Sequence, residues 1–226
     1  MNDLICPNAK TEIGLAMRLS SQNFANSEKC INFAQRTTEK KHTQVTMSLP
    51  LDEEKLIEQL RDNKTRNATF SAVVKAYSEM LYWHIRRMVI SHDDANDILQ
   101  NTFTKAWMGI DGFLGNAKLL TWLYRIATNE TLTFINKNSN TEFEDIDTVA
   151  AAIEADEWFD GDDLQARLQA AIQTLPPKQR IVFNMKYYDE MKYEEMSTIL
   201  GTSTGALKAS YHIAVKKICE YFDNEN

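Results

Sequence analysis

Hydrophobic residues recur at three- and four-residue steps through most of the chain after residue 52, the spacing that gathers side chains on one face of an α-helix. A short stripe of Leu56, Ile57 and Leu60 predicts one helix. The stripe that follows predicts an amphipathic helix of about five turns and consists of Phe70, Val73, Val74, Tyr77, Leu81, Ile85 and Met88. Strict two-residue alternation is scarce, so the pattern indicates an all-α protein.

Two more helices are expected before residue 138. His92-Asp93-Asp94 opens the first of them, because acidic side chains near a helix start suit the helix dipole. That helix should end at the break formed by residues 109–112. A loop from Phe113 to Lys118 follows, and a helix from about Leu119 to Asn136 comes after it.

Residues 164–222 repeat the helical pattern. The stripe of Leu164, Leu168, Ile172 and Leu175 predicts a helix, which Pro176-Pro177 should end because proline cannot continue a helix. The next helix is expected from Arg180 to Tyr188. Two further helices flank a Gly201-Thr202-Ser203 break, and their expected buried residues are Met196, Ile199 and Leu200 in the first and Leu207, Tyr211, Ala214 and Ile218 in the second.

A strongly acidic segment separates these two helical units. Residues 136–163 hold ten acidic residues and one base, and this net charge of −9 exceeds the −7 of the whole chain. Such a block repels itself and resists packing. We therefore expect an all-α fold of two small helical domains, residues 47–137 and 164–226, joined by an acidic linker at 138–163 with a short helical piece near 149–158.

Residues 1–46 are polar and lack sustained periodicity. We expect disorder there, with one short helix near 11–19. Because a clean helical pattern starts soon after Met47, a second interpretation is that translation begins at Met47 and that residues 1–46 are a mis-assigned extension.

The chain carries no pattern of a metal site, a catalytic site or a membrane protein. Cys6, Cys30 and Cys219 are scattered, as are the four histidines, and no GxSxG, P-loop or HExxH motif occurs. No apolar run approaches 18 residues, and no signal-peptide pattern opens the chain. We expect a cytoplasmic protein that is not an enzyme and uses no metal or cofactor.

The break at Gly201 is typical of a helix-turn-helix. Glycine adopts the left-handed conformation that a tight turn needs, and Ser203 is a good N-cap for the second helix. In this motif the second helix enters the major groove of DNA. The candidate DNA-contacting residues are Ser203, Thr204, Lys208, Ser210, His212 and Lys216. An ordinary helical hairpin with a solvated charged face is the alternative.

A second candidate nucleic-acid surface is the helix beginning near Leu119 together with the loop before it. Aromatic, basic and amide side chains alternate there, and such a mixture stacks on single-stranded bases while it holds the backbone. The loop could also receive a flipped base. The candidate residues are Asn116, Lys118, Trp122, Arg125, Asn129 and Lys137. In the alternative interpretation, Trp122, Leu123, Ile126 and Phe134 belong to the core.

Taken together, three blocks resemble the bacterial sigma-70 family of RNA polymerase sigma factors, specifically its extracytoplasmic-function (ECF) group. The resemblance covers roughly residues 70–222. The blocks are Asp94–Phe103 followed by Trp107, then Phe113 with Thr121–Asn129, and then Leu175–Arg180 with Tyr193–Glu195 and Gly205–Lys208.

The resemblance implies a promoter-specificity subunit with no chemistry of its own. Its partners would be the core polymerase, through the β′ clamp and the β flap, promoter DNA, and a separate anti-sigma factor. The second block would read and melt the minus-ten box, and the third would read the minus-thirty-five box. The first would dock on the clamp through Asp94, Asp97, Ile98, Gln100, Asn101 and Thr102.

The chain departs from the family pattern in its last helix. Ser210, Ile213 and Val215 stand where arginine is frequent, which predicts fewer phosphate contacts and a shallower dependence of binding on salt. Two other classes remain open: a two-domain regulator that binds DNA without docking on polymerase, and an adaptor that binds proteins only. Co-purification with core polymerase would separate the first from a sigma factor.

Overall fold

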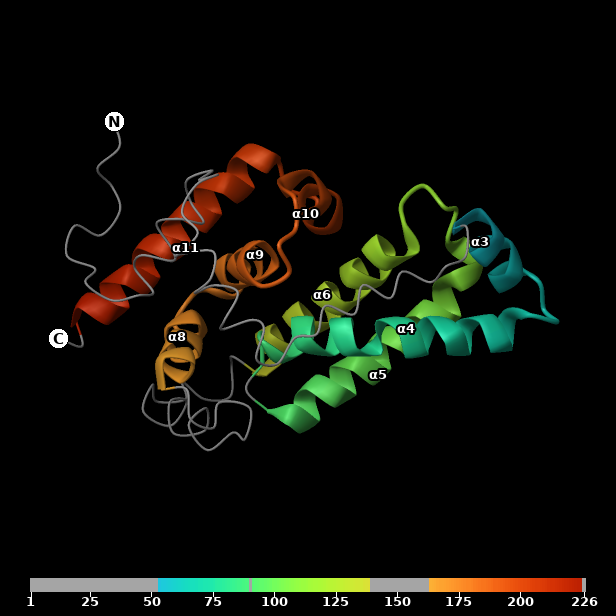
Figure 1. Ribbon diagram of the computed structural model, residues 1–226, viewed down its shortest axis with the longest axis horizontal. Helices are drawn as coiled ribbons and strands as arrows, with labels where there is room; N and C mark the ends of the chain where they lie inside the picture. Colours follow the sequence, from blue (N-terminus) through green and yellow to red (C-terminus); the bar gives the residue numbers. More distant parts are fainter. Residues whose placement is uncertain (1–52, 90, 139–162, 225–226) are drawn as a thin grey trace, which may run out of the picture.

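The computed structural model describes residues 53–89, 91–138 and 163–224, and every regular element in those ranges is helical, which confirms the all-α prediction. The first unit contains α3 (Glu53–Arg61), α4 (Arg66–Arg86), α5 (His92–Gly109), the short 3-10 helix η1 (Ile110–Gly112) and α6 (Leu119–Asn138) (Figure 1). The second contains α8 (Asp163–Gln173), α9 (Pro177–Tyr187), α10 (Tyr193–Leu200) and α11 (Thr204–Asn224).

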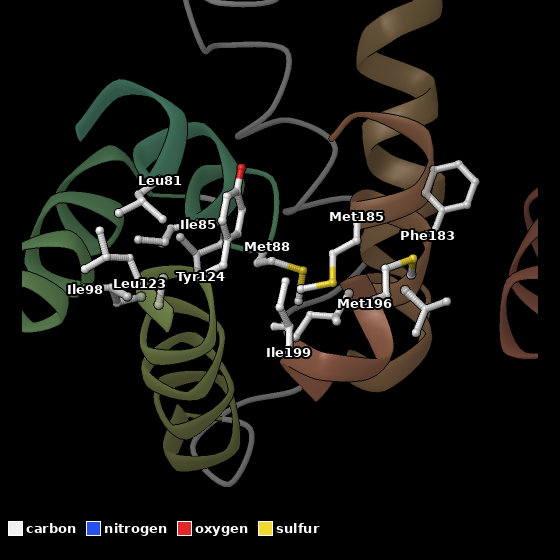
Figure 2. Packing of buried hydrophobic residues seen from close by; sticks show 14 of the residues in the cluster. Leu81, Ile85, Met88, Ile98, Leu123, Tyr124, Phe183, Met185, Met196 and Ile199 are labelled. Carbon is white, nitrogen blue, oxygen red and sulfur yellow. The ribbon is translucent and has the colours of Figure 1, made fainter. Parts of the chain in front are cut away.

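In the first unit α4, α5 and α6 pack against one another, and α3 packs on α4 beside η1. The predicted stripe on α4 points inward: Val73, Leu81 and Ile85 are fully buried. Ile98 of α5 and Leu123 of α6 meet Leu81 and Ile85 in the same core (Figure 2). The helix boundaries near residues 92, 109 and 119 agree with the predicted ones.

In the second unit α9 packs on α11, and α8 and α10 also contact α11. Phe183 is completely buried, and its ring stacks on Tyr187 at 5.2 Å and on Tyr211 at 5.8 Å between centroids. The start of α9 differs from the prediction of Arg180, because Pro177 occupies the first turn of the helix. Proline suits that position, since its missing N–H would have no partner there.

The two units are in direct contact, which the sequence pattern did not predict. Helices α9 and α10 pack against α6 (Figure 1). Met88, just beyond α4, lies with Met185 and Met196 between the two cores, and Ile199 of α10 adjoins them (Figure 2). The buried apolar residues of both units therefore form one continuous cluster.

Some predictions lie outside the described residues: the short helix near 11–19, the start at Met47, and most of the acidic linker with its helical piece near 149–158. Within the part of the chain that the structure describes, no helix is long and apolar enough to cross a bilayer.

Candidate nucleic-acid and protein interfaces

One candidate surface, the α5 face, is formed by Asp94, Asp97, Gln100 and Asn101. Ser91 caps the helix, and its Oγ accepts a hydrogen bond from the Asp94 N–H at 3.3 Å. Asp97, Gln100 and Asn101 are exposed. The pKa of Asp94 is raised above its ordinary value, mainly by partial burial and next by the nearby Asp97 carboxylate. The α5 face thus presents negative charge and amide groups to solvent.

Two residues expected on this surface lie inside the protein instead. Ile98 is 2% exposed and Thr102 is completely buried. The Thr102 hydroxyl donates to the Ile98 carbonyl at 2.8 Å, which satisfies it without any partner. Ile98 and Thr102 therefore pack α5 against the core and lie beneath its exposed face.

An apolar groove runs beside the α5 face, and the sequence pattern did not reveal it. It lies between α4 and α5 and is lined by Phe70, Val74, Ser78, Asn96, Leu99, Gln100, Phe103, Thr104 and Trp107. The Phe70 ring meets the edge of Trp107 at 5.0 Å and of Phe103 at 6.4 Å. Trp107 remains 38% exposed, so its ring forms an open end of the groove. Gln100 belongs both to this groove and to the α5 face.

The loop between η1 and α6 is held in a defined shape. Phe113 is buried, its ring lies 4.9 Å from that of Trp122, and its carbonyl accepts a hydrogen bond from Arg61 Nη2 at 2.9 Å. Gly115 has a φ of +76°, a conformation that side chains disfavour. With both sides of the loop fixed, Leu114, 72% exposed, and the exposed Asn116 point outward.

The candidate residues of α6 divide between surface and core. Arg125 and Asn129 are exposed one turn apart, and Lys118 and Lys137 are exposed at either end. Trp122 is half-buried against Phe113 and the core, which favours the alternative interpretation of that residue. The surface stripe of α6 is therefore polar and basic, and the Trp122 ring packs against Phe113.

The second nucleic-acid candidate has the predicted helix-turn-helix geometry. Gly201 adopts the left-handed conformation, with φ 62° and ψ 29°, and its N–H donates to the Ser197 carbonyl at 2.9 Å. Ser203 caps α11, since its Oγ accepts from the Ala206 N–H at 3.3 Å. At the other end of α10, Glu195 accepts from the Lys192 N–H at 3.0 Å. Local hydrogen bonds thus fix the turn at Gly201 and the first turns of α10 and α11.

Helix α11 buries one face and exposes the other, as predicted. Leu207, Tyr211, Ala214 and Ile218 are buried, whereas Lys208, His212 and Lys216 are exposed and Thr204 is partly exposed. Lys208 Nζ lies 5.6 Å from the Tyr193 ring centroid, so α10 steadies its position. Ser210 is half-buried and the Ser203 hydroxyl serves as the cap, so these two are less available to a ligand.

Positions 213 and 215, where the family often has arginine, differ in exposure. Val215 is 7% exposed and belongs to the core, whereas Ile213 is 45% exposed. Of these two departures from the family pattern, only Ile213 lies where a basic side chain would meet solvent or a phosphate.

Among the described residues neither a metal-holding cluster nor an exposed hydrolase-like triad is found. Within residues 53–89, 91–138 and 163–224, no three His, Cys, Asp or Glu side chains are placed to hold a metal ion. Thr128, His84 and Asp189 are linked at 3.0 and 2.8 Å in the order of a hydrolase triad. Thr128 and His84 are each 1% exposed, however, so no substrate reaches them.

Comparison with known proteins identifies both units. Residues 73–141 match the family Sigma-70 region 2, and residues 165–218 match the family Sigma-70, region 4. The chain is 34% identical over 155 residues to the ECF RNA polymerase sigma factor SigW of Bacillus subtilis, an alignment that covers 63% of this chain and 83% of SigW. It is also 26% identical over 179 residues to the ECF RNA polymerase sigma-E factor of Escherichia coli, over 72% of this chain and 90% of that protein.

A solved structure has the same fold. The sigma factor RpoE of Bartonella quintana, in complex with the anti-sigma factor NepR, aligns with a TM-score of 0.56 and 22% sequence identity. That alignment covers 70% of this chain and 98% of RpoE.

Proposed function

The chain belongs to the ECF group of the sigma-70 family and is a non-catalytic subunit that directs transcription initiation by RNA polymerase, and from this premise we propose how its surfaces divide that work. Sigma factors bind core polymerase and promoter DNA, so each surface is assigned to one of these partners. The proposed domains are region 2 from residue 47 to 137 and region 4 from 164 to 226, joined by the acidic linker.

The α5 face and the adjoining groove bind the β′ clamp of the core polymerase. The acidic and amide rim fits a basic partner, and the apolar groove offers the buried contact that exposed charges alone do not give. Asp97 and Gln100 are the direct contacts. Ile98 and Thr102 act through the packing of α5.

The loop 113–118 and the surface stripe of α6 bind the minus-ten box. Arg125 and Asn129, exposed one turn apart, hold the melted strand, and Lys118 and Lys137 contact phosphates. Asn116, in the outward loop, meets a displaced base. Because Trp122 is half-buried, its role is to support the loop through Phe113.

Helix α11 reads the minus-thirty-five box in the major groove. The observation that carries this assignment is the row of partly exposed Thr204 with exposed Lys208 and His212, on a helix whose start is fixed by Gly201 and Ser203. Lys216, farther along the helix, contacts a phosphate.

A separate anti-sigma factor regulates the protein, and the β flap is a further contact of region 4. The structurally similar RpoE was solved with its anti-sigma factor NepR, which supports the first of these proposals. We place the protein in the cytoplasm, where polymerase and promoters are.

The test is run-off transcription with purified core polymerase, paired with a polymerase-binding assay. Lys208→Ala should lower promoter use while polymerase affinity stays near wild type, with Lys217→Ala, also exposed on α11, as its control. Asp97→Ala with Gln100→Ala should weaken polymerase binding by roughly tenfold or more. Glu58→Ala, exposed on α3, is the control. Equal loss of polymerase binding in both variants would refute this division of labour.

A further inference from the structure

Ile213 is an exposed apolar residue on the helix assigned to the minus-thirty-five box. It is 45% exposed, whereas the next two residues of α11, Ala214 and Val215, are buried. In the part of the second unit that the structure describes, it is the one large apolar side chain with such exposure. The packing of the protein therefore does not use most of the Ile213 side chain, and it is available to a ligand of α11.

Ile213 shares a face of α11 with residues that have almost no side chain. Gly205, Ala209 and Ile213 are spaced four residues apart, so they form one row along the helix. All three are exposed. Lys208 and His212 each lie three residues from a member of this row, so they flank it on the helix surface. The outward face of α11 thus combines a basic row with a thin row that ends in one apolar side chain.

The missing side chain at Gly205 has no explanation within the described chain. Its φ is not in the left-handed region, and a Cβ there would meet no atom within 4 Å. Glycine destabilises a helix relative to alanine, so the fold gains nothing from it. A thin row does let a helix lie closer to a surface outside the chain. The major groove of DNA is about 12 Å wide and an α-helix with its side chains is about 10–12 Å across, so clearance there is small.

The charge around Ile213 fits DNA as that outside surface. Residues 201–217 contain three lysines and one histidine and no aspartate or glutamate, although the whole chain has a net charge of −7. The three lysines and the histidine are exposed. Such a surface attracts the phosphate backbone and disfavours a basic protein partner. The exposed isoleucine therefore lies in a setting suited to the major groove.

An isoleucine in the major groove distinguishes one base from the other three. Thymine presents its C5-methyl group there, whereas adenine, guanine and cytosine present hydrogen-bond donors and acceptors. Isoleucine offers no hydrogen bond, so it would leave those polar edges unsatisfied where it covers them. We propose that Ile213 contacts the methyl group of a thymine in the minus-thirty-five box and so makes an A·T pair at that position a determinant of promoter choice. Gly205 and Ala209 let α11 lie close enough for this contact, which rests on the proposed reading of the box by α11.

The test compares thymine with uracil, which lacks only the methyl group. The probe is a promoter duplex selected by the holoenzyme from a pool randomised in the minus-thirty-five box, with each thymine of the box replaced in turn by deoxyuridine. At one thymine the replacement should lower the affinity of the wild-type holoenzyme about fourfold, the effect of one buried methyl-sized group. Ile213→Ala should lower the affinity for the thymine duplex by a similar factor and should no longer distinguish uracil from thymine. Lys217→Ala, exposed one turn later, is the control and should keep the distinction.

Gly205→Ala tests the close approach with opposite expected signs. Alanine is the better helix former and meets no neighbour here, so resistance to urea should stay the same or rise. Promoter affinity of the holoenzyme should nevertheless fall severalfold, because the added methyl group occupies the clearance between α11 and the bases. Promoter affinity equal to that of the wild type would contradict the close approach of this row.

Four results would overturn the thymine contact. They are a selected box without an A·T pair, equal affinity of the wild-type holoenzyme for thymine and uracil duplexes, an Ile213→Ala variant that keeps the uracil effect, and weaker binding of that variant to core polymerase without DNA. Lys208→Ala distinguishes these from failure of the proposed function. If it leaves promoter affinity unchanged, α11 does not read the box. If it lowers the affinity while uracil has no effect, only the thymine contact fails.

Discussion

Replacing Gly115 by alanine tests whether the loop before α6 must keep its present shape for promoter melting. Gly115 has a φ of +76°, and a Cβ at that position would lie 3.1 Å from Ile57 Cδ1. The left-handed backbone costs an alanine about 1–2 kcal/mol. Reduced freedom of the unfolded chain offsets about 0.4–1 kcal/mol. The Ile57 contact adds little, because the end of that side chain can move, so the free energy of unfolding should fall by about 1 kcal/mol.

Urea denaturation followed by tryptophan fluorescence measures the change in stability, and permanganate reactivity of thymines in the minus-ten box measures melting. We expect Gly115→Ala to slow melting severalfold while polymerase affinity stays unchanged, because Gly115 lies in the loop after η1 and is not part of the α5 face. Gly112→Ala is the matched control: its φ is not in the left-handed region, and a Cβ there meets no atom within 4 Å.

Adding Ile57→Ala to Gly115→Ala separates the two causes of the lost stability, which are the backbone strain and the contact with Ile57. It removes the 3.1 Å contact but leaves the backbone strain, so most of the destabilisation should persist in the double variant. If Gly115→Ala matches Gly112→Ala in both stability and melting, the strained loop conformation does not position the groups that melt DNA.

Further predictions concern residues that the structure sorts differently from the sequence pattern. Ile213→Arg should steepen the salt dependence of holoenzyme–promoter binding by about one unit of slope, whereas Val215→Arg, at a buried site, should lower the free energy of unfolding by about 3–5 kcal/mol in urea titration. Thr102→Val should leave polymerase affinity near wild type and Gln100→Ala should weaken it, and equal losses would mean that Thr102 does more than pack. Burial raises the pKa of Tyr188 to about 12 from 10.0. The stability that depends on its neutral phenol should therefore be complete below pH 10 and be lost toward pH 12. The melting temperature of Tyr188→Phe should change less with pH across that window than that of the wild type.

The helix-turn-helix could be predicted because its signals are local. Gly201 and Ser203 act on atoms no more than four residues away, and the buried stripe of α11 follows a single period. The start of α9 was missed for a local reason too. A proline ends one helix and can begin another, and here Pro177 begins α9.

The contact between the two units could not be predicted in the same way. His84 and Asp189 are 105 positions apart in the sequence, and the spacing of hydrophobic residues around either one does not indicate its partner. Single-sequence patterns also assign faces only approximately. Ile98 and Thr102 were placed on the docking surface with their neighbours, although helix geometry turns both inward. The groove beside α5 needs two helices to exist, so its residues could be recognised only after α4 and α5 were packed.

The direct contact between the two units, in which Gln169, Arg180 and Asn184 donate to the backbone carbonyls just after α4, bears on how freely these proteins can be recombined. A chimera that joins residues 53–138 to the second unit of a different sigma factor would bring a foreign set of donors to the Arg87 and Met88 carbonyls. Each half could fold and still leave those carbonyls and Asp189 without their present partners. Modular exchange of promoter specificity should therefore succeed most readily when the last turn of α4 is transplanted together with the second unit.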